Sequence, residues 1–200
     1  MRHRGTPRQS DACAPPAIGG GNTVRTLAAV CHTDSDPLPF RMNPAPNPDF
    51  MRRAIALATE NVLSGAGGPF GAVIVRDGAV VGEGVNRVTL QNDPTAHAEV
   101  CAIRAAAHAL GAFRLSGCEI YTSCEPCPMC LAAIYWAHID RIWFGNSSAD
   151  AARVPFDDEF LYREIGLPAA QRAISSAMLL RQEAWESFQL WLDSPNKILY

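Results

Sequence analysis

Two short segments of the chain carry residue types that together can bind a metal and move protons. The first holds His97 and Glu99, and the second holds Cys127 and Cys130. One imidazole and two thiolates make three zinc ligands, and a catalytic zinc site leaves its fourth position to water. Zinc lowers the pKa of such a water toward about 7. Because Glu99 is not needed as a ligand, it is free to take a proton from the water and pass it to a leaving amine. The pattern therefore predicts a hydrolytic Zn²⁺ site.

Two other uses of the cysteines remain open from the residues alone. Cys124 lies just upstream of the pair and could close a site of four protein ligands, which would make the domain a non-catalytic zinc-binding interaction module. A redox dithiol at Cys127 and Cys130 has suitable spacing, but it would leave His97 and Glu99 without a task. Metal analysis combined with a test for exchangeable water would separate the module from the enzyme.

Composition limits the partners and the compartment. The 200 residues carry a net charge of −3 and 48% of them are hydrophobic, enough for one ordinary core. Lys197 is the only lysine, so the basic patch that holds nucleic acid is not visible and no nucleic-acid partner is expected. No apolar run approaches the roughly 20 residues of a membrane span, and no apolar segment suits a secretion signal. The clustered cysteines fit a metal better than disulfides, which favours the reducing cytoplasm.

The chain divides into a leader and one domain. Residues 1–47 are rich in proline and glycine, including Gly19–Gly21, and show no periodicity. We expect them to be disordered or an over-extended start. We expect residues 48–200 to form one domain, which carries the predicted zinc site.

Periodicity places both segments at the starts of helices. A helix capped by Asp49 and ended before Gly65 is followed by two strands, Phe70–Val75 and Val80–Val85, which Asp77-Gly78 joins in a tight hairpin. The next helix opens at Asp93-Pro94-Thr95 and ends at Gly111, which puts His97 and Glu99 in its first turn. The remaining expected elements are strand Glu119–Thr122, helix Cys127–Ala137, strand Arg141–Phe144, helix Asp158–Ile165, strand Ala177–Leu180 and helix Ala184–Trp191. This alternation predicts an α/β class with a mixed sheet covered by helices.

The two motifs resemble the cytidine deaminase-like superfamily, and most closely its bacterial guanine deaminases. The resemblance rests on the segments Asn92–Glu99 and Tyr121–Cys130, together with Gly68–Ala72 and Phe156–Phe160. It implies a three-layer α/β/α fold with a five-stranded mixed sheet. It also implies a zinc-dependent hydrolysis of guanine to xanthine and ammonia, and a homodimer in which C-terminal segments are exchanged to cover the partner's site.

The resemblance also implies four substrate contacts. Asn86 would read the edge of the base, Asp158 would face the amino group of guanine, Phe70 would stack on the ring, and Tyr200 would close the site. Each has an ordinary structural alternative. Asn86 suits a turn, Asp158 a solvated helix start, Phe70 the core, and Tyr200 a frayed terminus.

Two related reactions share the zinc motif. A tRNA adenosine deaminase would have to hold an anticodon loop by its phosphates, which the low lysine content disfavours. A guanosine deaminase differs only in whether the pocket leaves room for ribose, and the sequence does not decide this.

Overall fold

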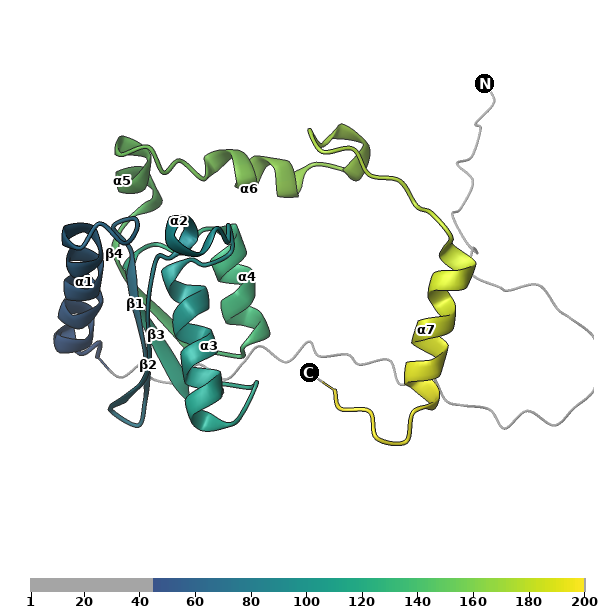
Figure 1. Ribbon diagram of the computed structural model, residues 1–200, viewed down its shortest axis with the longest axis horizontal. Helices are drawn as coiled ribbons and strands as arrows, with labels where there is room; N and C mark the ends of the chain where they lie inside the picture. Colours follow the sequence, from purple (N-terminus) through teal and green to yellow (C-terminus); the bar gives the residue numbers. More distant parts are fainter. Residues whose placement is uncertain (1–44, 200) are drawn as a thin grey trace, which may run out of the picture. The chain divides into compact units, whose positions relative to one another are not determined.

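The computed structural model describes residues 45–199, and within them the chain forms one sheet with helices on both faces (Figure 1). The strands are β1 (Gly71–Arg76), β2 (Ala79–Val85), β3 (Cys118–Cys124) and β4 (Arg141–Asn146). The helices are α1 (Pro48–Leu63), α2 (Val88–Gln91), α3 (Ala98–Leu110), α4 (Pro128–Trp136), α5 (Ser148–Arg153), α6 (Glu159–Gly166) and α7 (Arg181–Asp193), with a 3-10 turn η1 (Ala169–Gln171) before α7. In this described part, no helix combines the length and apolar character needed to cross a membrane.

The sheet is mixed, as expected, and its strand order is β2-β1-β3-β4. β1 is antiparallel to both β2 and β3, whereas β3 and β4 are parallel and are connected through α4. The predicted hairpin turn is confirmed. Asp77 and Gly78 both have positive φ, of 51° and 76°, which the tight two-residue turn between twisted strands requires.

The expected fifth strand is wrong for the described residues, where the sheet has four strands. The segment Ala177–Leu180 belongs to no strand, and Leu180 lies in the left-handed region with a φ of 52°. Met178 and Leu179 are about four-fifths exposed, at 78% and 80%. A short apolar segment becomes a strand only where a sheet edge receives its hydrogen bonds, and the sequence does not show where that edge lies.

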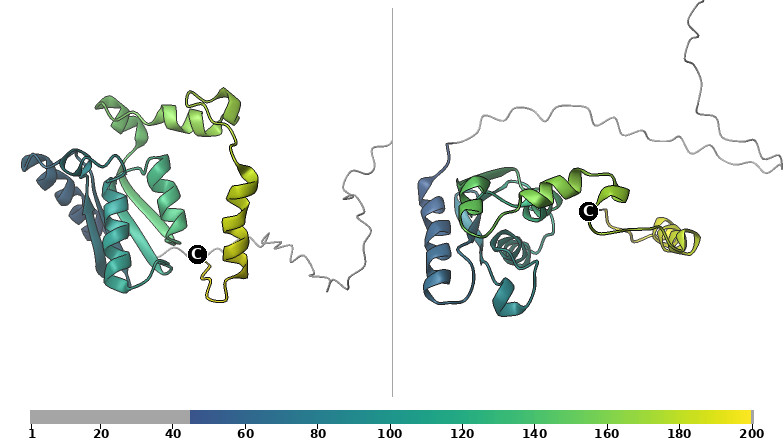
Figure 2. Two further views of the ribbon diagram at one scale, coloured as in Figure 1. Left: turned by 45° about the vertical axis from the view of Figure 1, so that its right-hand side comes forward. Right: turned by 90° about the horizontal axis from the view of Figure 1, so that it is seen from above.

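Side chains alternate along β1 between two apolar layers. Ala72 and Ile74 pack with the alanines of α3, while Val73 and Val75 pack on the other face with Ala54 of α1. Figure 2 shows the same arrangement from above, with α1 and α3 on opposite sides of the strands. Both faces of β1 are therefore buried, and the layers are α/β/α.

A glycine in β2 brings α3 unusually close to the sheet. A Cβ placed on Gly84 would lie 2.2 Å from the Ala98 carbonyl oxygen and 2.4 Å from the Ala102 nitrogen. Such distances exclude any side chain at this position. The first turn of α3, which carries Glu99, is consequently held directly against the strand.

Several helices begin at other residues than the sequence predicts. α1 is capped by Asn47, whose Oδ1 accepts from the Asp49 nitrogen at 2.9 Å, so Asp49 lies inside the helix. α3 begins at Ala98, because Asp93, Pro94 and Thr95 form a separate turn in which Asp93 Oδ1 accepts from the Thr95 nitrogen. α7 begins at Arg181 and ends at Asp193, so it is longer than the predicted helix.

Candidate active site

Three potential metal ligands converge where α3 and α4 begin. His97 Nδ1 lies 3.6 Å from Cys127 Sγ and 3.5 Å from Cys130 Sγ, and the three ligand atoms lie within 4.8 Å of one another. For a tetrahedral zinc with bonds of about 2.05 Å to nitrogen and 2.3 Å to sulfur, the nitrogen–sulfur separation is about 3.6 Å. The observed spacing therefore fits zinc without rearrangement.

The two helices begin at the ligands themselves. His97 is the N-cap of α3 and Cys127 is the N-cap of α4, and neither side chain caps its own helix with a hydrogen bond. Cys130 follows in the first turn of α4 and is buried. Because a helix N-terminus carries partial positive charge, both sulfurs lie where thiolates are stabilised.

The cysteine pair is poised to lose a proton. The Cys130 thiol donates to Cys127, and this contact together with His97 lowers the pKa of Cys127 to about 4. The same contact and burial raise the pKa of Cys130. Zinc binds cysteine as the thiolate, so a bound cation would favour the deprotonated form of both sulfurs.

Glu99 is a buried carboxyl group beside the three ligands. It is only 6% exposed, and burial raises its pKa above the usual range. In the part of the chain that the structure describes, the one cluster of three or more residues with metal-binding spacing is His97, Cys127 and Cys130, and Glu99 is outside it. A carboxyl with a raised pKa next to a metal can both accept and return a proton.

Cys124 does not complete a closed site. Its Sγ contacts the Ser147 carbonyl oxygen at 3.7 Å, and burial raises its pKa to about 11. Within the described residues, the cluster of ligand atoms within 4.8 Å of one another consists of His97, Cys127 and Cys130 without Cys124, so the arrangement fits three protein ligands and an open fourth position. The four-ligand interaction module is thereby disfavoured.

A cavity of about 580 Å³ lies beside the candidate metal ligands and Glu99. His97, Glu99 and Cys127 form one part of its lining. The other predicted substrate contacts within the described residues also line it, namely Phe70, Asn86 and Asp158. Tyr200 lies outside the described residues. The cavity therefore brings together, on one surface, residues from segments far apart in the chain, and its size is typical of small-molecule sites.

The polar side chains that line the cavity differ in whether they are already hydrogen-bonded within the protein. Asn86 is buried, and its Oδ1 accepts from the Val88 nitrogen at 3.3 Å, as expected of a turn asparagine. Asp158 is the N-cap of α6 but makes no side-chain capping bond. Partial burial and the nearby Cys127 raise its pKa. Its carboxylate is consequently available to a ligand in the cavity.

Two lining residues have roles that sequence reasoning did not assign. Phe156 meets Phe70 edge to face, with ring centroids 5.0 Å apart, and the two rings form an apolar corner of the cavity. Glu125 accepts from the Ser148 nitrogen at 2.9 Å and so connects the zinc-binding motif to α5. The position of Glu125 within the zinc-binding motif, between Cys124 and Pro126, could have marked it as a site residue. No nearby sequence feature identified Phe156 as a partner of Phe70.

Known proteins with the same pattern match most of the chain. The family model described as the cytidine and deoxycytidylate deaminase zinc-binding region matches residues 45–146. A guanine deaminase of Bacillus subtilis is 53% identical over 151 residues, which are 76% of this chain and 97% of that protein. An X-ray structure of guanine deaminase from Bacillus subtilis superimposes with a TM-score of 0.75 at 52% identity, covering 78% of this chain and 99% of that one.

A second kind of deaminase matches over a shorter stretch. A tRNA-specific adenosine deaminase of Agrobacterium fabrum is 51% identical over 77 residues, covering 38% of this chain and 51% of that protein. The similarity to the first relative therefore extends well beyond the stretch that the second one shares.

Proposed function

The chain belongs to the cytidine and deoxycytidylate deaminase family, and we propose that its reaction is the hydrolytic deamination of guanine to xanthine and ammonia. The observation that carries the proposal is a buried non-ligand carboxyl, Glu99, beside three converging zinc ligands in one cavity. Incubating the purified protein with guanine, guanosine, adenine, cytosine and an anticodon stem-loop, and measuring ammonia release from each, tests it. Release from guanine alone supports the proposal, and release from any other substrate in preference to guanine refutes it.

In the proposed mechanism, His97, Cys127 and Cys130 hold the zinc. When bound, zinc lowers the pKa of water to about 7 and so supplies hydroxide at neutral pH. Glu99 accepts one proton of the attacking water and donates it to a ring nitrogen, and it then takes the second proton of that water from the new hydroxyl group and gives it to the leaving amine. Burial of Glu99 raises its pKa, which suits a group that must give back the proton it receives.

The proposed recognition of guanine uses the opposite side of the cavity. Asp158 offers carboxylate oxygens to the N–H groups of the base, and the amide of Asn86 offers donors and an acceptor to its polar edge. Phe70, supported by Phe156, presents an apolar surface on which a purine ring can stack. Tyr200 is proposed to close the site and exclude water.

Neither alternative substrate has equal support. A tRNA substrate would require a basic surface, and the chain has a net charge of −3 and a single lysine. Guanosine is distinguished from guanine only by ribose, which the 580 Å³ cavity could accommodate, so it is measured beside guanine.

We propose no nucleic-acid or membrane partner. We also propose a cytoplasmic location, since the described cysteines are all free thiols.

We further propose that residues 48–200 form the catalytic domain of a homodimer whose C-terminal segments are exchanged. β4 ends the strand order and has no second neighbour among the described strands. α7 exposes large apolar side chains, with Trp185 at 52%, Phe188 at 63% and Leu190 at 74%. A helix of 13 residues is marginal in water without tertiary packing. A second copy of the chain, offering its own β4 edge and site, is the simplest surface to cover it.

Mixed dimers test the exchange. One chain carries Glu99→Gln and an intact C-terminus, and the other carries Glu99 but lacks Lys197 to Tyr200. If the tail of one chain closes the site of the other, the mixture is more active than either parent alone. A mixture no more active than its two parents refutes the exchange, and a monomeric mass in solution refutes the dimer.

A further inference from the structure

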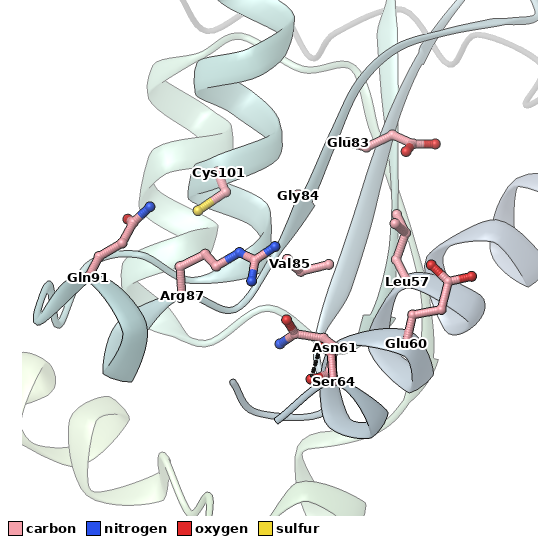
Figure 3. A pocket seen from close by; sticks show the side chains of 10 residues that line it. All are labelled: Leu57, Glu60, Asn61, Ser64, Glu83, Gly84, Val85, Arg87, Gln91 and Cys101. Atoms are coloured by element: carbon pink, nitrogen blue, oxygen red, sulfur yellow. Dashed lines mark hydrogen bonds between the residues drawn. The ribbon is translucent and has the colours of Figure 1, made fainter. Parts of the chain in front are cut away.

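A second hollow lies on the other side of the segment that carries Asn86. It occupies about 480 Å³ beside α1, β2 and α3, and its lining includes Asn61, Val85 and Arg87 (Figure 3). Asn86 and Val88 line the catalytic cavity instead. Residues 85–88 thus alternate between the two hollows and form the wall between them.

Asn61 stands on the far side of this wall and is nearly buried, with 4% of its surface exposed. Its Nδ2 donates to the Gly68 carbonyl oxygen at 2.9 Å and to the Asn86 carbonyl oxygen at 3.0 Å. One amide therefore joins the end of α1 to the two loops that carry Phe70 and Asn86.

The orientation of the Asn61 amide follows from these two carbonyls. Its Oδ1 is buried and has no hydrogen-bond partner among the described residues, which is unfavourable for an amide oxygen. The flipped orientation would be worse, because it would place Oδ1 against two carbonyl oxygens. Both donors of Nδ2 are thus used on the loops, and the oxygen is left unpaired as a consequence.

The backbone around Asn61 is tightly packed where the loops that carry Phe70 and Asn86 meet. A Cβ on Gly67 would lie 2.2 Å from the Asn86 carbonyl oxygen and 2.9 Å from Asn61 Nδ2. The Asn86 nitrogen donates in turn to the Phe70 carbonyl oxygen at 3.1 Å. A shift of either loop is consequently passed to the other.

We propose that Asn61 is a positioning residue for the substrate cavity, which holds the stacking side chain Phe70 and the base-reading side chain Asn86 at a fixed separation. This inference rests on the proposed function for the identity of the substrate. Asn61 itself touches neither the base nor the metal ligands. Its loss displaces the groups that bind the base and leaves Glu99 and the zinc ligands in place.

The test compares Asn61→Leu, which keeps similar volume without donors, with Asn61→Asp, which places an oxygen where Nδ2 was. For both, we expect unchanged zinc content, a KM for guanine raised about tenfold or more, and a kcat within about threefold of the parent. Hydrogen exchange of peptides covering residues 64–72 and 84–90 should accelerate. Gly67→Ala provides a second perturbation of the same junction that leaves Asn61 intact, and it should raise KM in the same way.

Trp143→Phe is the matched control. Trp143 Nε1 donates to Glu119 Oε2 at 2.7 Å, and the residue packs with the layer between the sheet and α1, away from the cavity. Its loss should reduce the melting temperature without raising KM.

The outcomes separate the inference from the proposed function. A parental KM in the Asn61 variants and Gly67→Ala, with only a lower melting temperature, overturns the positioning role. If the parent protein releases no ammonia from guanine, the proposed function fails. The positioning role of Asn61 is then tested by hydrogen exchange alone. It is overturned if residues 64–72 and 84–90 exchange as slowly in the variants as in the parent.

Discussion

Replacing Glu99 by glutamine tests the proposed chemistry most directly. Glutamine keeps the shape of the side chain and can still accept and donate hydrogen bonds, but it cannot carry a proton. General acid–base groups contribute about 10² to 10⁴ in rate, which corresponds to about 2.7 to 5.4 kcal/mol of transition-state stabilisation. Because Glu99 is buried, no solvent molecule can readily take over its task, so we expect a loss near the upper end. Zinc content should stay at one per chain, since Glu99 lies outside the ligand cluster.

The assay is ammonia release from guanine, with zinc analysis and a melting curve on the same preparation. Glu119→Gln is the control, because that carboxylate accepts from Trp143 on the face of the sheet covered by α1 and does not line the cavity. Its turnover should be unchanged. If Glu99→Gln keeps activity within a few-fold of the parent while holding its zinc, another group moves the protons and the mechanism is wrong.

Three further predictions address the metal, the scaffold and the C-terminus. Cys130→Ala should lose zinc and activity together, because it removes one of three protein ligands, and one tightly bound zinc per chain in this variant would show that another group is a ligand. Glu83→Gln should lower the free energy of unfolding by about 0.5 to 1 kcal/mol at pH 7, since Arg53 holds the Glu83 carboxylate with two hydrogen bonds of 2.8 and 2.7 Å and lowers its pKa. A lowered pKa stabilises the folded chain fully above the unfolded pKa of about 4.3 and loses that effect as the pH falls from there through the folded pKa, so the difference in melting temperature should shrink steadily below about pH 4.3, and a difference that does not shrink on further acidification would contradict the assignment. Removing Lys197 to Tyr200 should reduce guanine turnover about tenfold or more with the zinc content and melting curve unchanged, and normal turnover would show that the tail does not close the site.

The parts of the fold that depend on neighbouring residues were predictable from the sequence. Asp77-Gly78 specifies its tight turn through local backbone preference alone, and the strands that flank it follow. The convergence of His97 with Cys127 and Cys130 was also predictable, because three ligand types at helix starts point to one metal.

Features that depend on distant contacts were not predictable in this way. Ala177–Leu180 is apolar but has no β-branched or aromatic residue, and the position of a free sheet edge decides whether such a segment becomes a strand. Phe156 lines the cavity where it meets Phe70, and Asn61 supports the cavity from behind by donating to the Asn86 carbonyl oxygen. Neither residue belongs to a motif, and the contacts that give each its role join segments that are distant in the chain.

The residues at the N-cap positions of α3 and α4 are metal-ligand candidates rather than ordinary capping residues. The usual N-cap side chain accepts a hydrogen bond from the first turn and stabilises its helix by about 1 kcal/mol. His97 and Cys127 occupy the N-cap positions without making such bonds, because their side chains turn toward the third ligand, Cys130. The first-turn N–H groups of two helices are consequently left directed at the site, where their partial positive charge favours thiolates and the negative charge that develops on a base under attack. Both helices thus lack the stabilisation of a side-chain cap, and their N-terminal charge acts on the site instead. The close packing of α3 against Gly84 compensates by holding that helix from the other side.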